Sequence, residues 1–222
     1  LQKKFDEAIY YLEEAISQRG NDIRAMALLG QAYLKKKHDK KAFRLYSKIN
    51  HDFPENEIGY LELAKLLLME GQDEKAEKLL NKGLVKCPSP MQIYQLLIEY
   101  YRSRSMPSKE RACLLMVLKK NPDDVKYIVR MAELSFEMGA RADAYAWART
   151  LNDRSFTSFH LAYRFGKLLK QMGDFSSALQ LWEKALELED GHAKFHKDLS
   201  SLYFEVREYE NAWNHVLLAE EL

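Results

Sequence analysis

The chain has 222 residues, of which 47% are hydrophobic and 30% charged, and its formal net charge is +1 at pH 7. This composition is typical of a folded globular protein and excludes a disordered chain. A nearly neutral chain lacks the excess positive charge that attracts nucleic-acid phosphates, so we expect no nucleic acid among its partners. No apolar run approaches the roughly 18 residues of a bilayer span, so no transmembrane span is expected.

The first predicted element is a single helix within residues 1–20, at about Lys4 to Gln18, with no helix before it to form a pair. The last predicted helix runs to Leu222 without a polar helix to close the array. Arrays of repeats need capped ends to be soluble by themselves. We therefore expect this chain to be a segment of a longer protein.

Between these ends the sequence repeats every 34 residues, which predicts one structural unit per period. Glycines at three places mark the turn inside a unit, and three prolines mark its end: Gly71, Gly139 and Gly173, then Pro54, Pro88 and Pro122. Alanine occupies one slot of the period in most units: Ala8, Ala42, Ala76, Ala144, Ala178 and Ala212. Each unit then reads as a pair of helices, and six repeats are predicted to start near 23, 57, 91, 125, 159 and 193.

Two further slots predict close packing inside each pair. Small residues mostly fill a slot of the first helix, which favours close approach of its partner: Gly30, Ala64, Ile98, Ala132, Gly166 and Ser200. A larger residue follows the alanine slot of the second helix by four: Leu12, Tyr46, Leu80, Leu114, Trp182 and Val216. The tryptophans Trp147, Trp182 and Trp213 lie near these slots, so we predict that they belong to the core.

These slots carry a resemblance to a known family. The stretch that fits best is Met26, Leu29, Gly30, Tyr33, Ala42, Tyr46, Ile49 and Pro54. It resembles the signature of the tetratricopeptide repeat family, and the resemblance covers the whole chain. It implies an all-α fold, a right-handed superhelical solenoid of antiparallel helix pairs, as a single domain over residues 1–222.

The third and fourth repeats depart from this pattern. Glu110 fills the alanine slot of the third repeat, and Pro107 stands where the first turn of a second helix is expected. In the fourth repeat Ala148 and Leu151 exchange the usual large and small residues, and residues 152–158 read as a polar turn. Two interpretations remain open: drift compensated by neighbouring residues, or a change of curvature that shapes a binding groove.

No arrangement of residues predicts catalysis or a bound cofactor. The sequence has no nucleophile elbow, no glycine-rich phosphate loop and no metalloprotease or calcium motif. His192 and His196 are four residues apart but have no third ligand nearby, so no metal site is predicted. Cys87 and Cys113 show neither metal-ligand spacing nor a disulfide framework, and we interpret them as ordinary thiols. The basic run from Lys35 to Lys41 is interpreted as a solvated turn.

The resemblance implies that the first helices line a concave groove in which extended peptides lie. In repeats four to six, the first-helix residues outside the core stripe are basic: Lys126, Arg130, His160, Arg164, Lys167, Lys194 and Lys197. In repeats two and three the same face offers acidic and neutral polar residues, with Leu61 and Leu96 as apolar patches: Glu62, Lys65, Gln92, Gln95 and Glu99. We therefore expect a protein or peptide partner with an acidic segment.

One subfamily of these proteins grips the terminal carboxylate of chaperones with lysine, arginine and asparagine. Lys126 and Arg130 match one pair of that clamp, but Leu61, Lys65 and Leu96 occupy its other positions. The clamp is incomplete, so we do not expect a chaperone-tail receptor.

The expected function is that of a non-catalytic scaffold, which binds partner segments in its groove and assembles a multiprotein complex. Two alternatives stay open: the repeat region of a bacterial envelope secretion or polysaccharide-export apparatus, or a substrate-presenting arm of an enzyme such as a glycosyltransferase. Self-association is also left open. The expected compartment is the cytoplasm, or the periplasm if a signal peptide has been removed.

Overall fold

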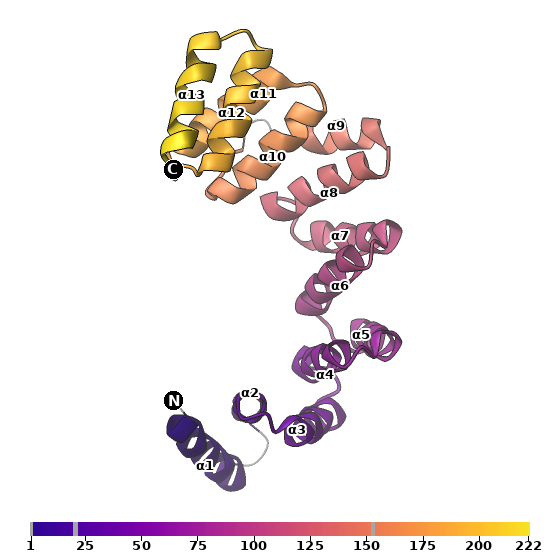
Figure 1. Cartoon of the computed structure of the whole chain (residues 1–222). Coiled ribbons are helices and arrows are strands. Elements are labelled where there is room, and N and C mark those ends of the chain that lie inside the picture. Colours follow the sequence, from indigo (N-terminus) through magenta and orange to yellow (C-terminus); the bar gives the residue numbers. More distant parts are fainter. Residues whose placement is uncertain (1, 20–21, 152–153) are drawn as a thin grey trace. The chain divides into compact units, whose positions relative to one another are not determined.

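The computed structural model describes residues 2–19, 22–151 and 154–222. In these ranges the chain forms thirteen α-helices and no strand. Figure 1 labels them: α1 (Gln2–Arg19), α2 (Ile23–Lys35), α3 (Asp39–Asp52), α4 (Glu57–Met69), α5 (Asp73–Lys86), α6 (Met91–Ser103), α7 (Pro107–Lys120), α8 (Val125–Glu137), α9 (Arg141–Arg149), α10 (Phe159–Gln171), α11 (Phe175–Leu186), α12 (Ala193–Glu205) and α13 (Tyr209–Glu221).

The first helices begin 34 residues apart, and capping side chains account for the starts of several of them. The side chain of Asp22 accepts hydrogen bonds from the backbone N–H groups of Arg24 and Ala25 and so caps α2. Asn56 and Asp124 cap α4 and α8 in the same way. These side chains satisfy N–H groups that have no partner inside the helix.

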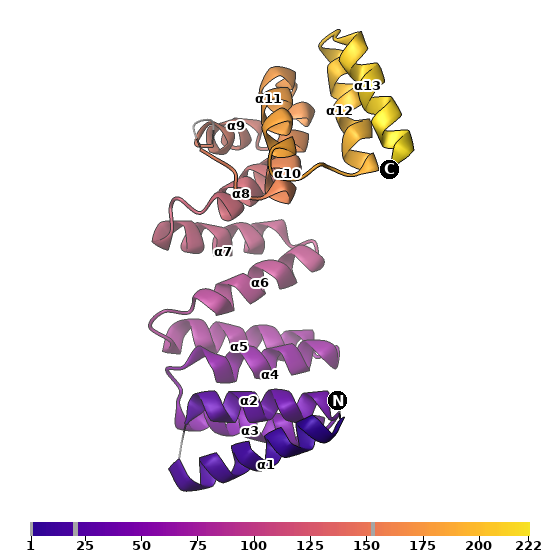
Figure 2. The same ribbon diagram turned by 90° about the vertical axis from the view of Figure 1, so that its left-hand side faces the viewer.

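The chain divides into two compact units, Leu1–Cys113 and Leu114–Leu222, and the boundary lies within α7. In unit 1, α2 pairs with α3 and α4 with α5, while α1 packs on α2 and α3 on α4 (Figure 2). In unit 2 the pairs are α8 with α9, α10 with α11 and α12 with α13, and α8 also contacts α10. The paired, antiparallel all-α architecture predicted from the period is thus confirmed. None of the described helices is long and apolar enough to cross a membrane.

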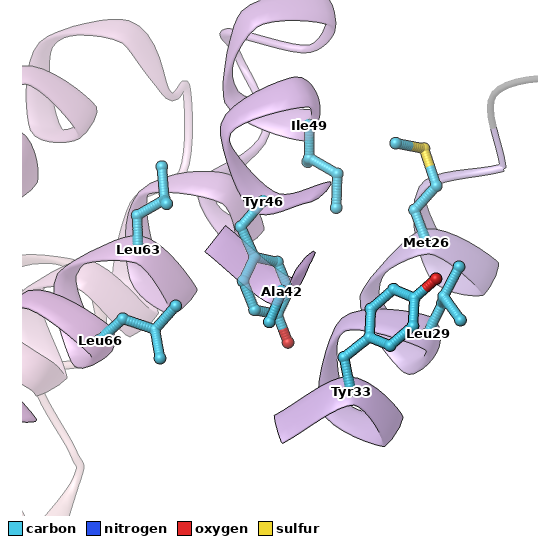
Figure 3. Packing of buried hydrophobic residues seen from close by; sticks show 8 residues of the cluster. All are labelled: Met26, Leu29, Tyr33, Ala42, Tyr46, Ile49, Leu63 and Leu66. Carbon is cyan, nitrogen blue, oxygen red and sulfur yellow. The ribbon is translucent and has the colours of Figure 1, made fainter. Parts of the chain in front are cut away.

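In two of the pairs, α2 with α3 and α10 with α11, the core depends on a glycine of the first helix that faces a large side chain of the second. A Cβ added to Gly30 would lie 2.4 Å from the ring of Tyr46, and one added to Gly166 would lie 2.0 Å from the Trp182 indole. Tyr46 and Trp182 are both fully buried. Around Tyr46 the core cluster is completed by Met26, Leu29, Tyr33, Ala42, Ile49, Leu63 and Leu66 (Figure 3).

The irregular repeats have visible compensations. Glu110, in the alanine slot of the third repeat, is 1% exposed, and its carboxylate accepts a hydrogen bond from Arg102 Nε at 3.1 Å. Pro107 is the first residue of α7, as predicted. In the fourth repeat α9 has nine residues, whereas α3, α5 and α7 each have 14. Of the predicted polar turn 152–158, the first two residues lie outside the described ranges, and 154–158 contain no helix.

The prediction that all three tryptophans are buried is wrong for one of them. Trp182 is fully buried and Trp147 is half-buried, but Trp213 on α13 is 62% exposed. Its register equivalent, Leu179 on α11, is 9% exposed. The slot therefore lies at the border of the core, and the sequence signal of an aromatic residue there does not decide its burial.

We predict that Gly30→Ala destabilises unit 1 by about 1–3 kcal/mol, because the new methyl group must displace the Tyr46 ring. The neighbouring Gln31→Ala, on the exposed side of α2, should change the free energy of unfolding by about 0.5 kcal/mol or less. In the background Tyr46→Leu, Gly30→Ala should cost less stability, because the smaller leucine leaves room for the methyl group. The equivalent slots of α4 and α5 already hold this combination, Ala64 and Leu80. Urea unfolding of the wild type, the two single variants Gly30→Ala and Tyr46→Leu, and the double variant measures the coupling energy. An equal cost of Gly30→Ala in the wild-type and Tyr46→Leu backgrounds would contradict the size-matching explanation.

A second prediction concerns the turn between the helices of each pair, where one residue always has a left-handed backbone. Gly71 has φ 71° there, but Lys37, Ser105 and Arg207 adopt φ values of 60°, 53° and 66° without being glycine. Ser105→Gly should therefore stabilise the protein by about 0.5–1 kcal/mol. Gly71→Ser should cost a similar amount, because a Cβ there meets no other atom and only the backbone matters. Thermal unfolding checks both signs, and a destabilising Ser105→Gly would refute the account.

Candidate functional site

The predicted groove residues of unit 2 lie on α8, α10 and α12. Lysines at the second, fifth and ninth residues of these helices share one face, because spacings of three and seven return to the same side of a helix. The exposed members of the predicted set are Lys126, His160, Lys167, Lys194 and Lys197. We call the four lysines among them the lysine row.

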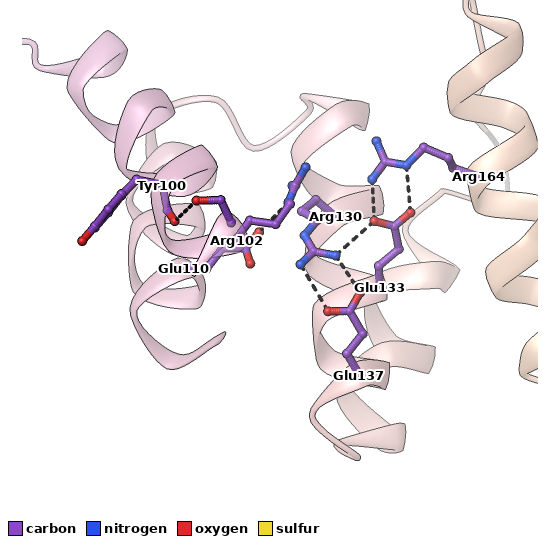
Figure 4. A network of polar contacts seen from close by, with 8 residues as sticks. Tyr100, Arg102, Glu110, Arg130, Glu133, Glu137 and Arg164 are labelled. Atoms are coloured by element: carbon purple, nitrogen blue, oxygen red, sulfur yellow. Dashed lines mark hydrogen bonds and ion pairs between the residues drawn. The ribbon is translucent and has the colours of Figure 1, made fainter. Parts of the chain in front are cut away.

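Two predicted groove residues, Arg130 and Arg164, are already engaged by carboxylates of α8 (Figure 4). Both Nη atoms of Arg130 bond to Glu137, at 2.8 and 3.2 Å, and Nη1 also lies 3.5 Å from Glu133. Arg164 grips the Glu133 carboxylate through two nitrogens, with Nε at 3.1 Å from Oε1. Arg130 is only 8% exposed. The positive charge of both arginines is thus compensated inside the protein.

The lysine row differs from these arginines because, among the described residues, its members form no ion pair. Lys126 lies over the ring of Tyr127 and Lys167 over that of Tyr163, with Nζ 5.3 and 5.5 Å from the ring centres. Such cation–π contacts leave the ammonium group able to accept an anionic partner. Tyr163 in turn donates a hydrogen bond to Asp198 on α12. The row therefore presents unpaired positive charge to solvent, whereas the charges of both arginines are paired with carboxylates of α8.

Between α8 and α10 this face has a hollow of about 240 Å³. Phe136 and Leu168 supply apolar surface, and Arg164, Lys167, Glu133 and Glu137 supply charges of both signs. Glu133 and Glu137 were missing from the sequence-based site. They lie three and seven residues after Arg130 on one helix face, and that spacing was the available signal.

The predicted groove residues of unit 1 carry less free charge. Lys65 Nζ lies 2.6 Å from Glu62 Oε1, so these two side chains neutralise each other. Gln95 and Glu99 are exposed. The expected apolar patch is wrong at Leu61, which is 4% exposed and belongs to the core, while Leu96 is half-buried.

A larger hollow, of about 730 Å³, lies beside the shortened α9, where the chain crosses to α10. Phe165, Leu169 and Leu181 contribute to its apolar wall, and Phe156 stacks on Phe165 with 5.6 Å between ring centres. Arg154 closes one side and pairs with Asp123 at 2.7 Å. No first-helix residue of the lysine row lines this hollow.

The two cysteines and His192, which the sequence singled out, have structural surroundings. Cys87 and Cys113 are buried, and burial raises the pKa of both thiols, that of Cys113 to about 11. A protonated thiol is a poor nucleophile and metal ligand. In the described part of the chain no three His, Cys, Asp or Glu side chains gather as a metal site would need. His192 caps α12 by accepting a hydrogen bond from the Phe195 N–H.

Family models of the tetratricopeptide repeat match residues 1–47, 57–100 and 163–218, which carry the slots described above. The chain belongs to the tetratricopeptide repeat family. Domains of this family are typically modules for protein–protein interaction and are generally non-catalytic.

Two curated relatives share parts of the sequence. Tetratricopeptide repeat protein 17 of Danio rerio is 23% identical over 179 residues, which are 71% of this chain and 15% of the relative. The F-box/TPR repeat protein pof3 of Schizosaccharomyces pombe is 34% identical over 83 residues, 37% of this chain and 14% of the relative. The matched regions thus span about a seventh of each of these two relatives.

Solved structures of tetratricopeptide proteins share the fold. PilF of Pseudomonas aeruginosa aligns with a TM-score of 0.68 at 15% identity, covering 98% of this chain and 93% of that one. The C-terminal part of a repeat protein from Cytophaga hutchinsonii aligns at 0.71 and 14% identity, covering 98% and 91%. YrrB, described as having an unusual peptide-binding site, aligns at 0.63 and 18% identity, covering 79% and 91%.

We predict that Glu133→Gln lowers the free energy of unfolding by about 1–3 kcal/mol, because Glu133 is mostly buried and serves two arginines. Glu99→Gln is a matched control: it occupies the same slot of the preceding repeat, is exposed and has no ion pair among the described residues. It should change stability by about 0.5 kcal/mol or less. Urea unfolding followed by circular dichroism measures both, and equal effects would show that the network adds no stability.

Proposed function

We propose that the face of unit 2 formed by α8, α10 and α12 binds an acidic segment of a partner protein, and that the chain acts as a non-catalytic scaffold. The observation that supports this proposal is the lysine row, whose four ammonium groups are exposed and form no ion pair among the described residues. The peptide-binding site named for YrrB shows that one protein of this fold binds peptides.

The two kinds of cation on this face have different roles in the proposal. Arginines bind carboxylates in a fixed two-pronged geometry, and Arg130 and Arg164 do so with carboxylates of their own chain. Lysines are flexible point charges and suit a segment whose carboxylates are irregularly spaced. The lysine row therefore attracts the partner, and the arginine network keeps α8 and α10 in place beneath it.

The hollow between α8 and α10 supplies a second element of recognition. Its apolar surface from Phe136 and Leu168 suits a hydrophobic side chain of the partner, placed between acidic residues that reach Lys167 and the lysines of α12. Charge then sets the rate of encounter, and burial of that side chain contributes affinity. A segment with acidic residues on both sides of an apolar one fits this face best.

The test uses peptides selected from a phage-displayed library of random 12-residue sequences on the purified chain. Selected peptides should be rich in Asp and Glu, and fluorescence anisotropy should show at least about tenfold weaker binding at 300 mM than at 50 mM NaCl. The triple variant Lys167→Glu, Lys194→Glu, Lys197→Glu should weaken binding more than tenfold, at about 1 kcal/mol per reversed contact.

The control is Lys184→Glu, a charge reversal at an exposed lysine of α11 that lines the other hollow. It should leave peptide affinity within about twofold, since a single distant surface charge is screened by salt. Peptides without acidic residues, or an affinity that is insensitive to both salt and the triple variant, would refute the proposal.

A further inference from the structure

In the last repeat, two slots that are otherwise held by apolar or weakly polar side chains are held by histidines. His196 takes the slot filled by Met26, Tyr60, Tyr94, Ile128 and Ala162 in the earlier repeats. His215 takes the slot filled by Leu45, Leu79, Cys113, Trp147 and Leu181. Both substitutions fall in one repeat, and they bring two titratable groups into the contact between its helices.

The structure joins these histidines directly across the contact between α12 and α13. Their Nδ1 atoms are 2.9 Å apart, and the rings stack with 5.1 Å between centres. His196 Nε2 lies 3.0 Å from the carbonyl oxygen of Asp190, just before α12. His196 is 5% exposed, and Tyr203 stacks with His215 at 5.3 Å. The pair thus links the turn before α12, α12 itself and α13.

The geometry limits how many protons the closed pair can hold. A carbonyl oxygen only accepts, so His196 Nε2 carries hydrogen and donates to Asp190. One proton serves the bond between the two Nδ1 atoms, and a further proton on His215 Nε2 leaves that bond intact. Another proton would have to enter at His196 Nδ1 and would set two N–H groups against each other. The closed pair therefore holds one extra proton, whereas two separated histidines hold two.

Other charged and titratable groups near the pair come from each neighbouring element. Burial lowers the pKa of His215, His196 lowers it further, and Glu183 of α11 opposes them. The Tyr203 hydroxyl donates to Glu183 at 2.8 Å, Glu208 precedes α13, and His192 lies at the start of α12. Because the closed state binds fewer protons than the open one, closure is favoured at neutral pH and is lost as pH falls below the ordinary histidine value of about 6.5.

We propose that the His196–His215 pair is a proton-operated latch, which holds α13 on α12 at neutral pH and releases it in acid. Release would also disturb α12, which carries Lys194 and Lys197. The latch rests on the histidine geometry alone and does not depend on the proposed function. Each proton taken up on opening raises the ratio of open to closed chains by up to about tenfold per pH unit.

Hydrogen exchange read by mass spectrometry tests the latch at pH 7.5 and pH 5.5, after correction for the intrinsic exchange rate. In the wild type the protection factors of α12 and α13 should fall at least about tenfold more than those of α4 and α5. In His196→Met with His215→Leu, which restores residues found in these slots at Met26 and Leu79, the excess should shrink below about twofold. An equal excess in both proteins would overturn the proposal.

A control and a second measurement guard against trivial results. His160→Gln removes an exposed histidine from the same unit and should keep the wild-type response, and loss of that response would count against the latch. If the double variant fails to fold, NMR titration of the six histidines in the wild type decides. Two coupled protonation steps for His196 and His215, one of them at a lower pH than those of the other four histidines, would support the latch. Independent titration of both histidines in the ordinary range would overturn it.

Discussion

Two helix pairs of this chain, α2 with α3 and α10 with α11, depend on a matching of sizes between one slot of the first helix and one slot of the second. Gly30 faces Tyr46 and Gly166 faces Trp182, so the two largest side chains of that slot meet the two residues that have no side chain. In the equivalent slots, α4 and α5 carry Ala64 and Leu80, whereas α8 and α9 carry Ala132 and Ala148. Size matching is therefore strictest in the two pairs that hold a glycine, where close packing leaves no room for an added methyl group.

This constraint also explains how polar residues enter the interior. Glu110 is nearly fully buried in a slot that usually holds alanine, and Arg102 compensates its charge across the turn. At the other end of the chain, His196 and His215 replace two packing residues and satisfy each other. In both places the polar group is held by a partner in the same repeat, since a buried polar group without one is costly. At both places, the departure from the repeat pattern stays within one repeat and involves two side chains that contact each other.

The periodic slots predicted the helix pairs well because they reflect packing that is repeated along the chain. The turn residues followed from the same register, including Pro107 at the start of α7. The candidate site was harder to predict, because exposure depends on which side chains pair with one another, and helix spacing alone does not decide that. Arg130 and Lys126 lie on the same helix face, yet Arg130 is buried and paired with two carboxylates, whereas Lys126 is exposed. The exposure of Trp213 likewise depends on what packs beyond its slot, and one helix alone does not contain that information.

The distribution of arginine and lysine on the face formed by α8, α10 and α12 follows from their chemistry. Holding neighbouring first helices together needs a rigid, bidentate contact, and Arg164 provides it by gripping Glu133 of the preceding repeat. A surface that binds a charged partner needs side chains that are not already paired within the protein. Lysine suits this, because its strongly hydrated ammonium group is stable when exposed to solvent. Lys167 lines the same hollow as Glu133 and Glu137 but forms no ion pair among the described residues, so its charge remains free. In the function proposed above, this separation of roles leaves the lysine charge of a nearly neutral chain available to an acidic segment.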